Sequence, residues 1–246
     1  MERLYRCKYW TKRLPEDQLL PDHIRIITEE SLKNKEKLVF DTISYGPSDH
    51  EKIDIFQGSK PALLIYFSGG YWQAYSGDIS AHGVEPFVQH GIHTAIVDYD
   101  RAPQVTVSQI VQQAIEATKK ILEFAKTQEI QSIWLSGHSA GAQLNAMILN
   151  SNWFNELKSQ DKKRFKGAFL LAGVYDLVPL LETTVNDPLQ MDENEASANS
   201  PMKLEGFLYK DLKMYLRVGE WDTPAFVSQT KAFAEKVIYF RFVSCT

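Results

Sequence analysis

Cysteine is scarce in this sequence: the chain has 2 cysteines among 246 residues, Cys7 and Cys245. They lie at opposite ends, without a CxxC pair or a spacing typical of metal ligands, which indicates free thiols rather than a disulfide scaffold. Long apolar runs are also missing. No segment approaches the ~18 apolar residues of a membrane span, and the start MERLYRCKYWTKRLPED has no apolar core of a secretory signal. These absences predict a cytoplasmic protein.

An excess of positive charge is missing as well. Lys and Arg number 27 against 31 Asp and Glu, which gives a net charge of −4. No overall positive field therefore favours nucleic acid or an anionic membrane as a partner. The basic cluster KSQDKKRFK, residues 158–166, is expected to be a solvated surface. With 44% hydrophobic residues the chain can bury one large core, and we predict a single domain over residues 1–246.

What the sequence does contain is a G-x-S-x-G pattern, in the stretch SIWLSGHSAGAQLN at residues 132–145. The apolar run at residues 133–135 is typical of a buried strand, and a helix is expected to start at about residues 143–149. Ser139 lies between them. This arrangement is typical of a nucleophile elbow, in which glycines permit a sharp turn and the serine hydroxyl stands above the sheet near a helix N-terminus.

The rest of the chain alternates strand and helix patterns. Residues 1–36 are expected to form an N-terminal flap with a helical stretch at 29–37, and residues 37–45 and 52–56 an antiparallel hairpin. Further strands are predicted at residues 62–67, 93–97, 168–172, 212–218 and 237–243, and helices at 77–90, 108–126 and 223–236. Residues 176–205 form a long excursion typical of a lid. This order predicts an α/β fold, a mostly parallel sheet with helices on both faces, led by the antiparallel hairpin.

Candidate functional features gather where strands end, at residues 68–72, 98–103, 139 and 219–222. Because the carboxyl ends of parallel strands share one edge of a sheet, we expect these features to lie close together. Two glycines directly after a buried strand can turn their N–H groups toward a substrate oxygen. The N–H groups of Gly69, Gly70 and Ala140 are therefore expected to form an oxyanion hole.

An acid and several aromatic residues belong to the same group of loops. Asp222 follows a strand and comes after the serine, as the Ser, Asp, His order of an α/β-hydrolase requires, and a solvated helix cap is its alternative interpretation. Tyr71, Trp72 and Trp221 could stack on an aromatic substrate, although aromatic residues at strand ends more often belong to the core or the rim.

The motifs SGGYWQ, VDYDRAP, GHSAGAQL, LAGVYDL, ANSP and GEWDTPAF, with SYG and KIDIF before them, resemble those of the kynurenine formamidase (arylformamidase) family of α/β-hydrolases. The similarity runs from about residue 45 to 236. It implies hydrolysis of N-formyl-L-kynurenine to L-kynurenine and formate in tryptophan catabolism, without a metal or an organic cofactor. It also implies Ser139 as the nucleophile, Asp222 as the triad acid, and Gly69, Gly70 and Ala140 as the oxyanion hole. The expected partner is a small aromatic formamide, and a homodimer stays open.

The sequence departs from the family pattern in two places. Ser68 stands where the family has a histidine before the paired glycines, which is expected to loosen the loop without abolishing the oxyanion hole. The family's general base is a histidine well beyond the acid, but none of the 6 histidines follows Asp222. His138 is expected to point into local packing, and His82 is the upstream candidate for a base. The ending KVIYFRFVSCT is shorter than the family's connection, which indicates a truncated C-terminal end.

Two other functions stay open. A serine hydroxyl without a base is a poor nucleophile at neutral pH, which favours a catalytically impaired family member that binds an aromatic ligand or a partner protein through residues 176–205. The glycine pair and the elbow are equally compatible with a carboxylesterase acting on small acyl esters.

Overall fold

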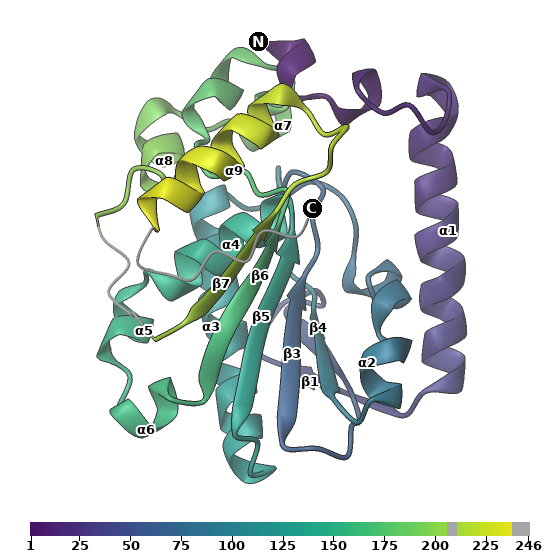
Figure 1. The fold of residues 1–246 in the computed structure, drawn as a ribbon, viewed down its shortest axis with the longest axis vertical. Coiled ribbons are helices and arrows are strands. Elements are labelled where there is room, and N and C mark those ends of the chain that lie inside the picture. The colour runs from purple at the N-terminus through teal and green to yellow at the C-terminus, as the bar shows by residue number, and fades with distance from the viewer. Residues whose placement is uncertain (206–210, 238–246) are drawn as a thin grey trace.

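The computed structural model describes residues 1–205 and 211–237 and contains one central sheet (Figure 1). Its seven strands follow the order β1-β2-β4-β3-β5-β6-β7. The strands are β1 (Phe40–Ser44), β2 (Lys52–Phe56), β3 (Ala62–Phe67), β4 (His93–Val97), β5 (Ser132–His138), β6 (Phe165–Leu171) and β7 (Lys213–Arg217). The pairs β1 with β2 and β2 with β4 are antiparallel, and all other neighbours are parallel. The predicted hairpin and mostly parallel sheet are confirmed.

Four long helices and several short ones surround the sheet. The long ones are α1 (Glu16–Lys37), α3 (Val107–Thr127), α4 (Ala140–Leu149) and α9 (Pro224–Lys236), and the short ones α2 (Glu85–Gln89), α5 (Asn152–Glu156), α6 (Ser159–Lys162), α7 (Asn186–Leu189) and α8 (Glu193–Ala198). Short 3-10 turns are η1 (Glu2–Tyr5), η2 (Cys7–Tyr9), η3 (Gly77–Ile79), η4 (Ala81–Gly83) and η5 (Val178–Glu182). None of the helices in the described part is long and apolar enough to cross a bilayer.

Two of the predicted elements differ from the structure, and a third lies almost wholly outside the described residues. The helix expected at residues 77–90 is wrong: the chain makes η3, η4 and α2 there. The Gly77 N–H donates to the Asp98 side chain, and Pro86, which has no N–H, stands in the first turn of α2, a position that proline favours. The helical stretch at 29–37 extends back to Glu16, with Pro21 inside it. The strand predicted at 237–243 falls almost wholly outside the described residues, and Val237 caps α9.

The sheet separates two cores over β2, β3 and β4. Successive side chains of a strand point to opposite faces, so Ile55 and Ala95 belong to the large core, which α3 and α4 also line, whereas Phe56 and Ile96 belong to a smaller core beside η4. Both faces of these strands are therefore covered.

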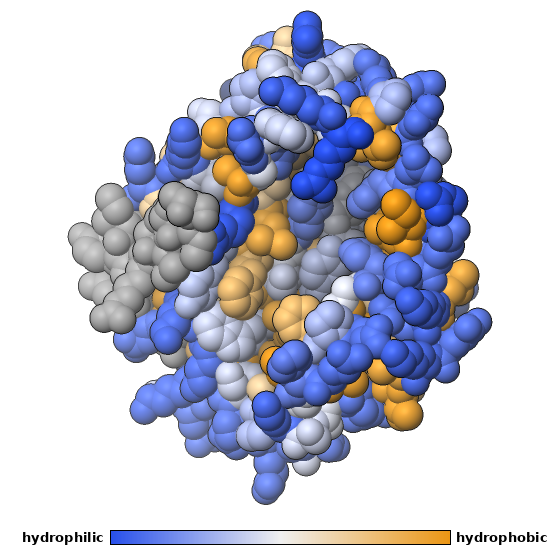
Figure 2. Space-filling view, turned by 45° about the vertical axis from the view of Figure 1, so that its right-hand side comes forward, coloured by the Kyte–Doolittle hydropathy of each residue, from blue (hydrophilic) through white to orange (hydrophobic). Residues whose placement is uncertain are grey.

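Over β5, β6 and β7, one face of the sheet carries aromatic side chains that are partly exposed. Trp134, Phe169 and Tyr215 stack on one another there, with ring centroids 5.2 Å apart in the first pair and 4.9 Å in the second. Phe169 remains 37% exposed. Figure 2 shows a hollow on this side of the molecule with hydrophobic residues along its floor and hydrophilic residues around it.

The N-terminal segment and the long excursion are both anchored at the upper end of the sheet in Figure 1. Tyr5 is part of the large core, and so are Leu180 and Leu189 of the excursion, which folds into η5, α7 and α8. The Glu2 carboxylate joins the two segments, because it accepts hydrogen bonds from the Thr184 N–H and hydroxyl, each at 2.7 Å. Both segments are thus packed structure at the edge where the candidate features gather.

Candidate active site

Ser139 stands at the junction of β5 and α4 that the sequence predicted. Its backbone has φ 55° and ψ −117°, a conformation that residues with a Cβ rarely adopt. The strain is held by the neighbouring strand, since the Ser139 N–H donates to the Leu171 carbonyl at 2.8 Å. On its other side, the Ser139 carbonyl accepts from the Ala142 N–H at 3.0 Å as the helix begins. The sharp turn of a nucleophile elbow is therefore present.

The two glycines of the pattern allow this turn. A Cβ on Gly137 would lie 2.4 Å from the carbonyl carbon and oxygen of Gly141. A Cβ on Gly141 would lie 2.0 Å from the carbonyl oxygen of Phe67. Helix α4 therefore starts in direct backbone contact with β5 and with the end of β3, which places Ser139 next to the loop that follows β3.

Gly69 of that loop lies against the serine. A Cβ on Gly69 would be 2.9 Å from the His138 carbonyl oxygen and 3.1 Å from the Ser139 Cβ. Gly70 has φ 103°, which glycine adopts without strain. Within the described residues, the N–H groups of Gly69, Gly70 and Ala140 donate no hydrogen bond. Unpaired N–H groups of this kind, one of them at a helix N-terminus, suit a negatively charged oxygen.

Asp222 lies on the loop between β7 and α9. β5, β6 and β7 end in register, because His138 pairs with Leu171 and Leu171 with Arg217. The protein atoms around the His138 imidazole lower its pKa although the residue is accessible to solvent, and the negative charge of Asp222 opposes this shift. The carboxylate is therefore within electrostatic reach of the residue before Ser139. No hydrogen bond joins Asp222 to Ser139 among the described residues; its Oδ1 accepts from the Thr223 N–H at 3.1 Å.

All 6 histidines lie in the described part of the chain, and none of them is hydrogen-bonded to Ser139 or Asp222. Five of them contact other groups. The His23 ring packs against the Tyr75 ring, and the other four make polar contacts: His50 with the Asp98 carboxylate, His82 with the Ile79 carbonyl, His90 with the Pro86 carbonyl and His93 with the Gly58 N–H. Across residues 1–205 and 211–237, no group of three or more His, Cys, Asp and Glu side chains is arranged to hold a metal ion.

The expectation that His138 points into local packing is wrong, because its side chain is exposed. The neighbouring glycine explains this. The His138 Nδ1 lies 3.1 Å from where a Cβ on Gly69 would stand, so the missing side chain leaves the imidazole uncovered. The ring therefore lies against the Gly69 backbone.

The three aromatic candidates have different environments. Trp72 is fully buried, and its indole N–H donates to the Gln143 side chain at 3.1 Å, so it has no exposed face for a ligand. Tyr71 is partly exposed, and its hydroxyl donates to the Tyr5 carbonyl at 2.5 Å. Trp221 is 42% exposed, with the Lys12 ammonium 5.2 Å from its ring centroid. Only Tyr71 and Trp221 therefore offer surface to a substrate.

The N-terminal segment also contributes to this site, which its sequence pattern does not reveal. Tyr5 contacts the loop after β3 through Tyr71, and the Tyr5 hydroxyl accepts from Gln229 of α9 at 3.0 Å. Cys7 is exposed, and the surrounding protein together with the Asp222 charge raises the pKa of its thiol to about 11. In the N-terminal segment, only the aromatic residues scattered among the charged ones indicate packing against the rest of the protein. They do not reveal which loops the segment contacts.

Comparison with known proteins identifies relatives of this chain. A family model described as the alpha/beta hydrolase fold matches residues 64–237. The chain is similar to the kynurenine formamidases of Salmo salar, 31% identical over 242 residues, and Danio rerio, 32% identical over 242 residues; each match covers 95% of this chain and 80% of the relative. Among solved structures it is similar to a putative thioesterase from Silicibacter sp. TM1040, with 26% identity and a TM-score of 0.83 over 98% of this chain and 88% of the other.

Proposed function

Because the chain belongs to the α/β-hydrolase fold family, and within it to the kynurenine formamidase-like hydrolases, we propose that it hydrolyses N-formyl-L-kynurenine to L-kynurenine and formate, a step of tryptophan catabolism. One observation carries this proposal: the strained Ser139, at φ 55°, lies beside Gly69 and the unpaired N–H groups of the loop after β3. Such an arrangement suits acyl transfer from an amide or ester.

The proposed reaction begins with attack of the Ser139 hydroxyl on the formyl carbonyl carbon. The carbonyl oxygen gains negative charge and accepts hydrogen bonds from the Gly69, Gly70 and Ala140 N–H groups. The C–N bond then breaks, the aromatic amine leaves as kynurenine after taking up a proton, and a formyl ester remains on Ser139. Water hydrolyses this ester, which releases formate and restores the hydroxyl. Asp222 is the proposed acid of the site.

The proton of the Ser139 hydroxyl needs an acceptor in this scheme. In the described residues no histidine nitrogen is hydrogen-bonded to that hydroxyl, which favours a second candidate function, binding without turnover. In that case the fold holds an aromatic ligand near Tyr71 or a partner protein through residues 176–205.

Kynurenine release separates the two candidates. The purified 246-residue chain is incubated with N-formyl-L-kynurenine, and kynurenine is measured by its absorbance against a buffer blank. Release above the blank supports the hydrolase. Saturable binding of the formamide, measured by calorimetry without any release, would support the binding protein instead.

An esterase is a third candidate, favoured by the 26% identity with the putative thioesterase over 98% of this chain. A thioester or a short p-nitrophenyl ester presents the same carbonyl to the serine and has a better leaving group. Ester cleavage with kcat/KM above that of the formamide would assign the site to esters, and cleavage of the formamide alone would exclude this candidate.

We expect the change of Gly69 to alanine to lower kcat for the formamide by roughly 10- to 100-fold. The added methyl would lie 3.1 Å from the Ser139 Cβ and 2.9 Å from the His138 carbonyl, so the loop must move away from the serine. Steady-state kinetics measure the effect, and thermal unfolding verifies that the fold is retained. The control is Gly83→Ala, since a Cβ at Gly83 meets nothing within 4 Å. Equal kcat values for both variants would argue against an oxyanion role for Gly69.

A further inference from the structure

The loop that follows β3, residues 68–77 and called the oxyanion loop below, has an unfavourable backbone. Positive φ occurs at Gly70 (103°), Tyr71 (52°), Trp72 (59°) and Tyr75 (64°). Only the glycine tolerates this region without cost, so the other positions must be held by contacts outside the loop. Without such contacts the loop would relax, and the Gly69 and Gly70 N–H groups would turn with it.

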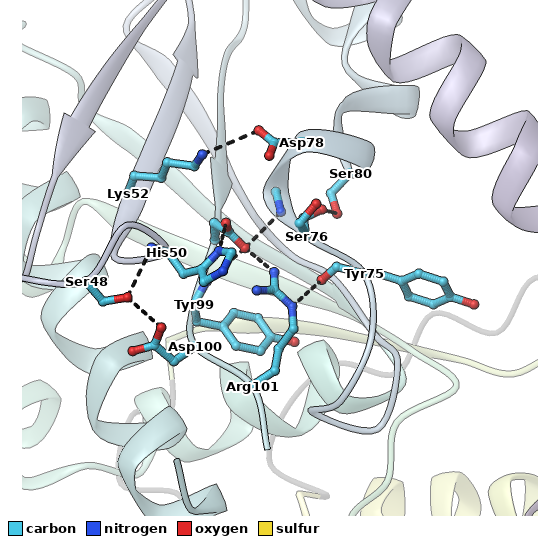
Figure 3. A network of polar contacts seen from close by, with 12 residues as sticks. Ser48, His50, Lys52, Tyr75, Ser76, Asp78, Ser80, Tyr99, Asp100 and Arg101 are labelled. Carbon is cyan, nitrogen blue, oxygen red and sulfur yellow. Dashed lines mark hydrogen bonds and ion pairs between the residues drawn. The ribbon is translucent and has the colours of Figure 1, made fainter. Parts of the chain in front are cut away.

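Besides the contacts of Tyr71 with Tyr5 and of Trp72 with Gln143, four contacts come from residues 98–102, directly after β4; Figure 3 shows the one between Arg101 and Tyr75. This segment meets the oxyanion loop at four points spread along its length. The Tyr99 hydroxyl donates to the Ser68 carbonyl at 3.0 Å, the Ala102 N–H to the Trp72 carbonyl at 3.0 Å, the Arg101 Nε to the Tyr75 carbonyl at 3.0 Å, and the Gly77 N–H to Asp98 Oδ1 at 2.9 Å. Two of the three strained residues, Trp72 and Tyr75, are therefore held by their carbonyl groups.

Asp98 is the centre of this set of contacts. Its side chain is 2% exposed, and Oδ1 accepts from the Gly77 N–H, the Tyr99 N–H and the Arg101 guanidinium. Its Oδ2 lies 3.0 Å from the His50 Nδ1. A buried carboxylate with this many donors has little freedom to move, and removing one partner leaves a charge without compensation.

Arg101 links the Asp98 carboxylate to the oxyanion loop. Its side chain is 13% exposed, and its guanidinium contacts the Asp98 carboxylate and the Tyr75 carbonyl together. The planar fork of an arginine can make both hydrogen bonds in one fixed geometry, whereas a lysine ammonium on a flexible stem cannot. In the sequence, residues 98–103 are recognisable as a feature at a strand end, but their pattern does not predict this role.

We propose that Asp98 and Arg101 are positioning residues, which hold the oxyanion loop in its strained form so that the Gly69 and Gly70 N–H groups remain directed at the carbonyl oxygen attacked by Ser139. This rests on the proposed hydrolase function. Neither side chain touches the substrate. Loss of the Arg101 contact therefore weakens stabilisation of the developing negative charge, which affects kcat, and leaves substrate binding nearly unchanged.

The test uses Arg101→Lys, which keeps the charge and removes the fork. Its matched control is Arg164→Lys. Like Arg101, Arg164 contacts an aspartate three positions away, Asp161, and a backbone carbonyl, that of Ile130. Arg164 lies directly before β6, however, at the opposite ends of the strands from the candidate site. Hydrogen–deuterium exchange of peptides covering residues 68–77 is measured for both variants and the wild type. Steady-state kinetics on the formamide give kcat and KM separately.

We expect Arg101→Lys to raise deuterium uptake in residues 68–77 and to lower kcat by roughly 10-fold with KM within about 2-fold, and Arg164→Lys to do neither. Unchanged uptake in Arg101→Lys overturns the proposal, and so does raised uptake with an unchanged kcat. If the wild type releases no kynurenine, the proposed function fails, and the exchange experiment still decides whether Arg101 holds the loop.

Discussion

Replacing Ser139 by alanine is expected to lower kynurenine release by roughly 10³-fold or more, because the variant has no hydroxyl to form the formyl ester. The change is small in structural terms. The serine side chain makes no hydrogen bond within the described residues, and its backbone strain at φ 55° is maintained by the N–H contact to Leu171. The loss should therefore appear in kcat, with the melting temperature close to that of the wild type.

The matched control for this experiment is Ser136→Ala, three positions earlier on β5, where the side chain is also buried. Labelling with a fluorophosphonate gives a second readout, since the wild type and Ser136→Ala should gain one adduct on the peptide that contains Ser139, and Ser139→Ala none. Equal rates of kynurenine release by the wild type and Ser139→Ala would remove the serine mechanism. Catalytic groups that act together are strongly non-additive, so the size of the loss also reports whether a base assists Ser139.

Changing Gly141 to alanine is expected to destabilise the whole protein, by about 3 kcal/mol or more. The new methyl would lie 2.0 Å from the Phe67 carbonyl oxygen and 2.8 Å from that of Ser68. Both contacts are to backbone, so no side chain can rotate away. Helix α4 would have to separate from β3, which opens the large core between them. Chemical denaturation monitored by circular dichroism measures the loss.

Gly83→Ala is the control for stability as well, and we expect its free energy of unfolding to change by less than about 0.5 kcal/mol. Gly83 is exposed, and its Cβ would meet no atom within 4 Å. A stable Gly141→Ala variant would mean that the elbow and β3 are not in backbone contact, which would contradict the geometry on which the proposed site is built.

The parts of this fold that follow from local pattern could be predicted from the sequence. The unbroken apolar run of β3 and the two-residue period of β2 are both typical of strands, and both strands are present, although the polar positions of β2 are buried as well. The helix expected at residues 77–90 failed for the opposite reason. The Asp98 carboxylate, in the segment after β4, accepts a hydrogen bond from the Gly77 N–H at the start of this stretch, and no local pattern records that contact.

The candidate site shows the same division. The strand, turn and helix around Ser139 are adjacent in the chain, so the elbow could be predicted from the G-x-S-x-G spacing. The exposure of His138 depends on Gly69, which is far away in the sequence. The burial of Trp72 depends in the same way on Gln143, and such packing partners are known only from the folded chain.

The attachment of the first residues has a practical consequence for anyone who prepares this protein. Glu2 is tied to Thr184, and its hydrogen bonds there and with Arg6 lower the pKa of its carboxyl to about 2. Tyr5 is tied to Tyr71 of the oxyanion loop. Removal of the first few residues by a protease would take away both contacts, and with them one support of the oxyanion loop. Kinetic work on this protein is therefore best done with residues 1–5 intact.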